Sequence, residues 1–238
     1  MLVAAAVCPC PPLLVPEVAA GAAAELDAAR AACSDALGVL AAARPERLVV
    51  LGPTPGAGTE SYPEGTPGSF RGFGVNLGVR LGRGDRPDSG RELPVSLAVA
   101  AWLLERWQGL PDVPVEGIGV SGTAGTERCV RRGRDLAAGP GRVALLVMGD
   151  GSACRTLKAP GYFDERAEPF DAEIARSLGA ADLAALTALD AGLARELQAA
   201  GRAPWQVLAG AAEGTRLGGA LLYEDAPYGV GYFVAAWS

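Results

Sequence analysis

Short apolar runs bounded by Gly- and Pro-rich turns alternate along the chain with longer stretches whose apolar residues recur at helical spacing. The run V-A-L-L-V-M at 143–148 contains no polar residue, which is typical of a strand buried on both faces of a parallel sheet. Other runs predict strands at 2–7, 47–51, 73–81, 114–120, 219–223 and 230–236. Helical spacing predicts helices at 17–43 (kinked near Gly21), 93–107, 127–138, 171–178, 181–189, 191–200 and 205–212, and the segment 57–74 is predicted to be irregular. This alternation predicts an α/β fold, with one domain over 1–238 and a central, mostly parallel sheet flanked by helices.

Polar residues follow two of the predicted strands directly. The turn G-D-G-S at 149–152 places Asp150 and Ser152 at the carboxyl end of the strand 143–148, and ligands of open α/β sheets bind at that edge. The first strand runs into C-P-C-P-P at 8–12, whose extended backbone can point Cys8 and Cys10 to one face. We therefore expect a pocket at this edge, with Asp150, Ser152 and Cys10 as candidate catalytic residues. In the alternative interpretation, Asp150 caps the turn after its strand through the N–H groups of Ser152 and its neighbours.

The amino-acid composition restricts the possible chemistry of a functional site more than it restricts the fold. The 238 residues include no histidine, which excludes His-ligated metal sites and Ser-His-Asp or Cys-His pairs. The net charge of −6 disfavours a nucleic-acid partner or an anionic membrane surface. Five cysteines in a chain of this length do not indicate a disulfide framework, and we expect no signal peptide, because 1–7 has no basic residue and runs into prolines. No apolar run approaches the roughly 20 residues needed to span a bilayer. These features predict a cytoplasmic protein with reduced thiols.

Four segments at predicted strand ends carry a resemblance to a known family: 8–15, 52–55, 148–153 and 224–234. In this order they resemble the subunit-B-like superfamily of class III extradiol ring-cleavage dioxygenases, which includes protocatechuate 4,5-dioxygenase β subunits, DOPA dioxygenases and Memo proteins. The chain is similar to an uncharacterised actinobacterial branch that begins C-P-x-P-P-L-L-V-P-E and ends P-Y-G-V-G-Y-F-V-A. The resemblance implies that family's fold and a nonheme Fe(II), held by two histidines and a carboxylate, that binds a catecholate and O2.

None of the family's histidines has a counterpart here. Cys10 stands where the first metal-binding histidine is expected, Thr54 where the second is expected, and Ala153 where the acid–base histidine is expected. Glu224 corresponds to the carboxylate ligand. We therefore expect no cofactor, with Fe(II) or zinc bound only if a site has been rebuilt around Cys10, and a remaining pocket lined by Cys8, Thr54, Ala153 and Tyr228.

Three functions are compatible with these residues. The first is a dioxygenase-like protein without metal-dependent catalysis that binds a small molecule or a protein partner. The alternative is a divergent enzyme that uses Cys10, Asp150 and Glu224, with or without an unusual metal. The third is a phosphate-ligand site in the Gly-rich loop 121–126, where the arginines at 128, 131, 132 and 134 form either a solvated helix face or an anion site. A homodimer through the Ala- and Leu-rich segment 180–197 is also expected.

Overall fold

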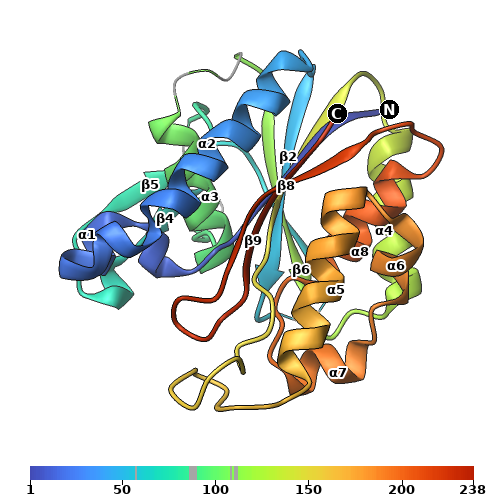
Figure 1. The fold of residues 1–238 in the computed structure, drawn as a ribbon. Helices are drawn as coiled ribbons and strands as arrows, with labels where there is room; N and C mark the ends of the chain where they lie inside the picture. The colour runs from blue at the N-terminus through green and yellow to red at the C-terminus, as the bar shows by residue number, and fades with distance from the viewer. Residues whose placement is uncertain (57, 86–89, 108, 110–111) are drawn as a thin grey trace.

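A seven-stranded sheet with helices on both faces forms the centre of the molecule (Figure 1). The computed structural model describes residues 1–56, 58–85, 90–107, 109 and 112–238. The strands of this sheet, in the order β3-β6-β2-β7-β1-β9-β8, are β1 (Leu2–Cys8), β2 (Arg47–Thr54), β3 (Thr59–Tyr62), β6 (Val115–Ser121), β7 (Val143–Met148), β8 (Gly219–Asp225) and β9 (Tyr232–Trp237). A second sheet pairs β4 (Pro67–Ser69) with β5 (Gly78–Arg80). The central sheet with helices on both faces confirms the predicted α/β fold, and strands from both ends of the chain contribute to it.

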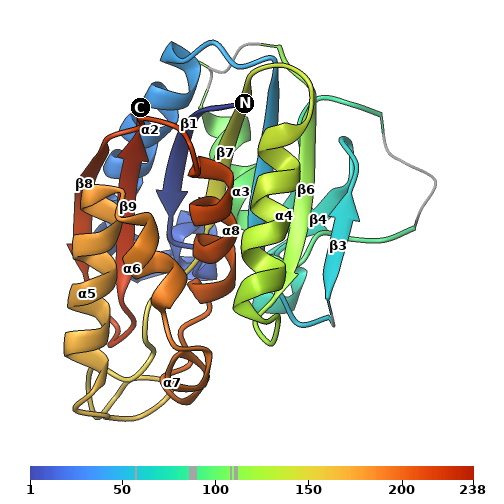
Figure 2. The same cartoon turned by 90° about the vertical axis from the view of Figure 1, so that its right-hand side faces the viewer.

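The four central strands are parallel. β7 lies between β2 and β1, and β6 pairs with the other side of β2. The three remaining strands are antiparallel to their neighbours: β9 to β1, β8 to β9, and β3 to β6. The carboxyl ends of the parallel strands therefore meet at one edge of the sheet, while both chain termini lie at the opposite end (Figures 1 and 2).

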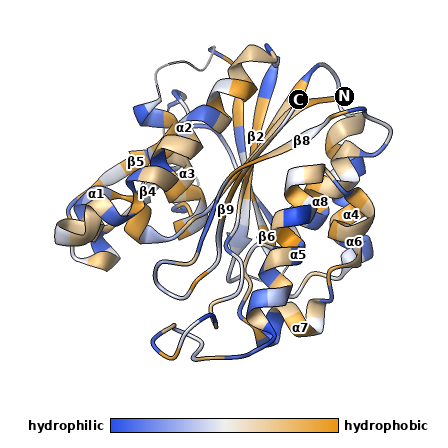
Figure 3. Ribbon diagram, in the orientation of Figure 1, coloured by the Kyte–Doolittle hydropathy of each residue, from blue (hydrophilic) through white to orange (hydrophobic). Residues whose placement is uncertain are grey.

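Two helical layers cover the sheet (Figure 1). On one side, here called the α2 face, lie α2 (Asp27–Ala42) and α3 (Val95–Arg106), with the short helices η1 (Pro12–Leu14), α1 (Pro16–Ala19), η2 (Ala20–Leu26) and η3 (Arg71–Phe73) nearby. The other side, the α8 face, is covered by α4 (Thr126–Ala138), α5 (Ala167–Ala180), α6 (Leu183–Ala188), α7 (Ala191–Glu196) and α8 (Arg202–Ala212). Each face has its own hydrophobic core, and the apolar residues follow the strands and the helix sides between the layers (Figure 3).

β7 contributes to both cores because side chains alternate along a strand. Val143, Leu145 and Val147 belong to the core on the α8 face, whereas Leu146 and Met148 belong to the core on the α2 face. All six residues of β7 are buried. This arrangement explains why the run is uninterrupted by polar residues, and it confirms the prediction of a strand covered on both faces.

Helices α4 and α8 pack with their backbones in close approach. A Cβ built at Gly133 would lie 2.0 Å from the Val207 carbonyl oxygen, and a Cβ at Gly210 would lie 2.1 Å from the Val130 carbonyl oxygen. Only glycine leaves room for this crossing, so these two residues set the distance between the helices.

The predicted single helix over 17–43 is wrong in one respect, because the chain is divided into α1, η2 and α2. The break occurs at Ala20, which follows the last residue of α1 and has a positive φ (49°). The kink was expected near Gly21, one residue later. From Asp27 onward the helix is continuous, and its apolar stripe packs into the core on the α2 face.

The segments at 57–74 and 73–81 also differ from expectation. The first, of which residue 57 lies outside the described part, contains β3 and β4 and is not wholly irregular. Within the described part of the chain, β3 pairs only with β6 and is an edge strand. Its sequence, T-E-S-Y, is polar, so no apolar pattern predicted it. In the second, only Gly78–Arg80 is a strand, and Phe73 belongs to η3.

Among the described residues, no helix combines the length and apolar character that crossing a bilayer requires.

Candidate functional site

The loops after β1 and β7 meet at the carboxyl edge of the sheet. Pairing of the two strands continues to their ends, where the Gly149 N–H donates to the Cys8 carbonyl (3.0 Å). A Cβ at position 149 would lie 2.5 Å from the Gly201 Cα, so the turn requires glycine there. This turn directs Asp150 toward the loop that follows β1.

Asp150 and Cys10 form a direct pair across these loops. The Cys10 N–H donates to Asp150 Oδ1 at 2.8 Å, and the thiol lies 3.7 Å from Oδ2. Burial raises the pKa of Asp150 to about 6, although the two hydrogen bonds from Cys10 act in the opposite direction. Burial, and then the Asp150 charge, raise the pKa of the Cys10 thiol. Near neutral pH the pair therefore consists of a carboxyl group close to its titration point and a protonated thiol.

Tyr232 of the β8–β9 hairpin adjoins this pair, and Tyr228 of the same hairpin lies near Tyr232. Tyr232 begins β9 and is 2% exposed, and its pKa is raised by burial and then by the Asp150 charge. The Tyr228 hydroxyl is buried and has no hydrogen-bond partner within the described part of the chain. Its pKa is raised by burial and by the nearby Glu25 carboxyl. Cys10, Asp150, Tyr228 and Tyr232 are called the Asp150 site below.

Ser152 belongs to a different network, in which Ser152 and Asp171 are fully buried. Its N–H and hydroxyl donate to the two carboxylate oxygens of Asp171 on α5, at 2.8 and 2.7 Å. Arg155 approaches the same carboxylate at 3.4 Å. A Cβ at Gly151 or Gly231 would lie 2.7 or 2.5 Å from an Asp171 oxygen, so the two glycines make room for this carboxylate. The network ties the loop after β7 and the β8–β9 hairpin to α5.

The interpretation of Asp150 as a cap on its own turn is wrong, because the Ser152 N–H donates to Asp171 and not to Asp150. Sequence reasoning did not single out Asp171, although a signal was present. Asp171 lies on the same side of its helix as Ile174, Ala175 and Leu178, all of which are buried. A charged residue within an apolar stripe indicates a buried polar contact.

The other predicted pocket residues are distributed around this edge. Cys8 is fully buried on the α2 face, where a hydrogen bond with the Cys33 thiol, and then burial, raise its pKa. Thr54 ends β2 and is buried, with its side chain on the side of Gly119 and Tyr62. Ala153 is buried, and its N–H donates to the Leu197 carbonyl at 2.9 Å.

The metal that the family resemblance implies does not fit these residues. Glu224 is exposed and pairs with Phe233, whose side chain belongs to the core on the α8 face. Cys10 belongs to the α2 face, so the sheet separates these two side chains. No group of three Cys, Asp or Glu residues converges anywhere in the described ranges. The protonated Cys10 thiol is also a poor metal ligand, because metals bind the thiolate.

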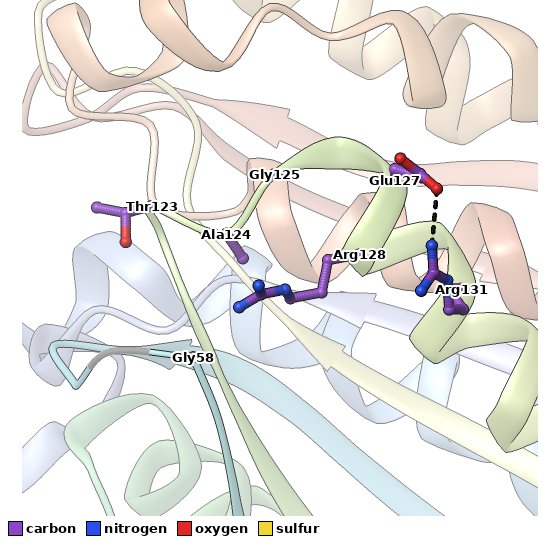
Figure 4. Close-up of a pocket in the computed structure, with 7 residues that line it drawn as sticks. All are labelled: Gly58, Thr123, Ala124, Gly125, Glu127, Arg128 and Arg131. Carbon is purple, nitrogen blue, oxygen red and sulfur yellow. Dashed lines mark hydrogen bonds and ion pairs between the residues drawn. The ribbon is translucent and has the colours of Figure 1, made fainter.

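A hollow lies at the start of α4, where the sequence predicted an alternative phosphate site (Figure 4). This cavity of about 530 Å³ is lined by Thr123, Gly125, Arg128 and Arg131, among others. Glu127 also lines it and pairs with Arg131 at 2.7 Å, which neutralises part of the positive charge. The arginines at its mouth are exposed, as a solvated helix face would be.

Arg202 is buried and forms hydrogen bonds with the loop before α4. Its guanidinium donates to the carbonyl oxygens of Gly122 and Ala124 and to the Gln206 side chain. Burial lowers the pKa of Arg202. The hydrogen bonds of Arg202 go to the protein itself, so its charge orders the loop.

No protein-family model matches the chain, and no curated protein matches it. Among solved structures, it is similar to the crystal structure of the uncharacterized protein JW3007 from Escherichia coli K12. The two share 15% sequence identity and align over 99% of each chain, with a TM-score of 0.52. At this identity the likeness shows a shared fold, and it extends over the whole mixed α/β domain.

Proposed function

We propose that this chain is a ligand-binding protein with an extradiol dioxygenase-like fold, which binds a small hydroxylated organic molecule at the Asp150 site without metal-dependent ring cleavage. The observation that carries the proposal is Asp150 itself. Its carboxyl group is enclosed enough to titrate near pH 6, while part of the residue remains exposed at the sheet edge where ligands of such folds bind. In keeping with the five free cysteines, we place the protein in a reducing, cytoplasmic compartment.

The groups around Asp150 define the ligand chemistry. An ionised carboxylate accepts a hydrogen bond from a ligand hydroxyl, and the buried Tyr228 hydroxyl gains a partner if a ligand oxygen reaches it. Tyr232 adds an aromatic surface beside the carboxylate. A phenol or catechol offers these complementary features, and the family resemblance points to the same class of compound.

Calorimetric titration with catechol tests this proposal. We expect binding that strengthens as the pH rises through about 6, because the ionised carboxylate is the better acceptor. Asp150→Asn should weaken binding by about 10- to 100-fold and remove the pH dependence, since a hydrogen bond to a charged group contributes roughly 1.5–3 kcal/mol. Glu168→Gln, at an exposed residue of α5, serves as the control and should bind catechol as the native chain does. Equal affinity in the native chain and Asp150→Asn would place the ligand elsewhere.

The second candidate is a divergent enzyme in which Asp150 transfers protons. A carboxyl pKa of about 6 favours it, because an acid–base group is most effective when its pKa is close to the working pH. The two candidates differ in the fate of the ligand. Proton NMR of catechol incubated with the protein, with and without Fe(II) and O2, should return unchanged catechol if the chain only binds it. New resonances that disappear in Asp150→Asn would establish the enzyme instead.

A further inference from the structure

A small cavity lies on the α8 face of the sheet, where α7 leads into α8 (Figure 2). It has a volume of about 270 Å³, and its walls come from the end of α7, the start of α8 and the loop after β6. Much of this lining consists of alanines, at 194, 199, 200 and 203. The cavity therefore offers space and apolar walls for a ligand of a few carbon atoms.

Arg202 lines this cavity with a charge that no carboxylate balances. The residue is 2% exposed and forms no ion pair with a described residue. Its three hydrogen bonds go to neutral oxygens, those of Gly122, Ala124 and Gln206. Because a guanidinium has five N–H donors, two of them have no acceptor in the described part of the chain. A buried charge without a counter-charge is costly, and an anion beside it lowers that cost.

Asp190 is the carboxylate whose negative charge acts on Arg202, but it does not serve as a counter-ion. It is exposed at the start of α7, where it accepts a hydrogen bond from the Leu193 N–H at 2.6 Å. Its charge raises the pKa of Arg202, whereas burial lowers it by more. The cavity beside Arg202 is therefore a place where an additional negative charge is stabilised.

Two further features add positive potential to the same cavity. Arg195, in the last turn of α7, is exposed at its rim and forms no ion pair within the described ranges. Helix α8 begins at the cavity, and its N-cap residue, Gly201, has no side chain to cap the first N–H groups. The described lining contains no Asp or Glu, in contrast to the hollow at α4, where Glu127 neutralises Arg131.

We propose that this cavity binds a small organic carboxylate, whose oxygens accept hydrogen bonds from Arg202 and from the first N–H groups of α8, while its short hydrocarbon chain contacts the alanines. The planar fork of a guanidinium matches a carboxylate. The alanine walls favour a ligand with an apolar part over inorganic phosphate, which needs polar partners on all sides. The cavity lies on the α8 face and the Asp150 site contacts the core on the α2 face, so this proposal does not depend on the function proposed above.

Calorimetric titration of the native chain with butyrate at pH 7 tests this proposal. We expect one site with a dissociation constant of about 1 mM, which a ligand of six non-hydrogen atoms can reach. Ala200→Leu places a larger side chain in the cavity and should weaken binding at least about tenfold. Ala200 is half-buried and belongs to neither core, so this variant should keep the native circular dichroism spectrum.

Two arginine variants complete the test. Arg202→Met should reduce butyrate binding below detection, and because Arg202 also orders the loop before α4, its folding is checked by circular dichroism. Arg131→Gln removes an exposed arginine from the hollow at α4, and this matched control should bind butyrate as the native chain does. In ¹⁵N-labelled native protein, butyrate should shift the Nε–H resonance of Arg202 and leave that of Arg131 unchanged.

Three results would overturn the proposal. The first is a native chain that gives neither heat nor thermal stabilisation with butyrate at about 20 mM, since a ligand well above its dissociation constant stabilises the fold it binds. The second is butyrate binding that Ala200→Leu leaves unchanged or that Arg131→Gln abolishes, because the ligand then lies elsewhere. The third is tighter binding of inorganic phosphate than of butyrate, which would contradict the carboxylate class.

Discussion

At the scale of single residues, Asp150 is the group whose titration should be visible in the stability of the protein. Its pKa is raised from 3.8 to about 6 by burial. Between these two values the folded chain retains a proton that the unfolded chain has released, so the free energy of unfolding falls as the pH rises through this window. Above pH 6 the folded state carries the full cost of an enclosed charge.

Asp150→Asn should remove this cost. The amide oxygen can still accept the Cys10 N–H, so the loop contact is preserved. We expect the variant to be more stable than the native chain by about 3 kcal/mol above pH 7, and to lose most of that advantage near pH 4. Urea denaturation at pH 4, 5, 6 and 8 measures the difference, and comparing the two chains cancels the titration of Asp171. A constant difference across this range would show that the Asp150 pKa is not raised.

The two carboxylates near the carboxyl edge illustrate what sequence alone resolves at this scale. Asp150 was identifiable because it follows an unmistakable strand and stands between two glycines. Its partner, the Cys10 backbone N–H, was not, because 140 residues separate them and no local pattern connects them. The burial of Asp171 could be inferred from its place in an apolar stripe, but its donor Ser152 and the glycines at 151 and 231 that make room for it could not, because no local pattern connects them.

At the scale of elements, the crossing of α4 and α8 should be intolerant of any side chain at its two glycines. Gly133→Ala or Gly210→Ala would place a methyl group about 2 Å from a carbonyl oxygen of the other helix. The backbones must then move apart, and we expect a loss of about 3 kcal/mol or more in the free energy of unfolding. Thermal and urea denaturation of the two variants measure this loss.

The matched control is Gly38→Ala in α2, where an added Cβ meets nothing within 4 Å. Because alanine is the better helix former, this variant should gain roughly 0.5–1 kcal/mol. If all three alanine variants behaved alike, the close contact between α4 and α8 would be refuted. The helices themselves were predictable from periodicity, but their separation was not, because a glycine within a helix pattern does not reveal which partner it faces.

At the scale of the whole molecule, strands from the two ends of the chain pair with each other in the main sheet. β9, near the carboxyl terminus, is inserted between β1 and β8, and it places Tyr232 in one core and Phe233 in the other. The strands of the main sheet, except the polar β3, and their order along the chain were predictable from apolar runs. Their positions in the sheet were not, because β1 pairs with β7 and β9, which are far away in sequence.

The pairing of β1 with β9 predicts opposite outcomes for two changes to the chain. Removing residues 219–238 deletes β8 and β9, exposes β1 and opens both cores, so the truncated chain should be unfolded or aggregated.

A circular permutant keeps every strand. Ala5 pairs with Trp237, so the termini are neighbours, and a linker of about six Gly and Ser residues can join them when new ends are placed between Glu213 and Gly214. We expect the permutant to show the native circular dichroism spectrum and a single cooperative urea transition. A folded truncated chain, or an unfolded permutant, would show that the pairing of the two chain ends does not hold the sheet together.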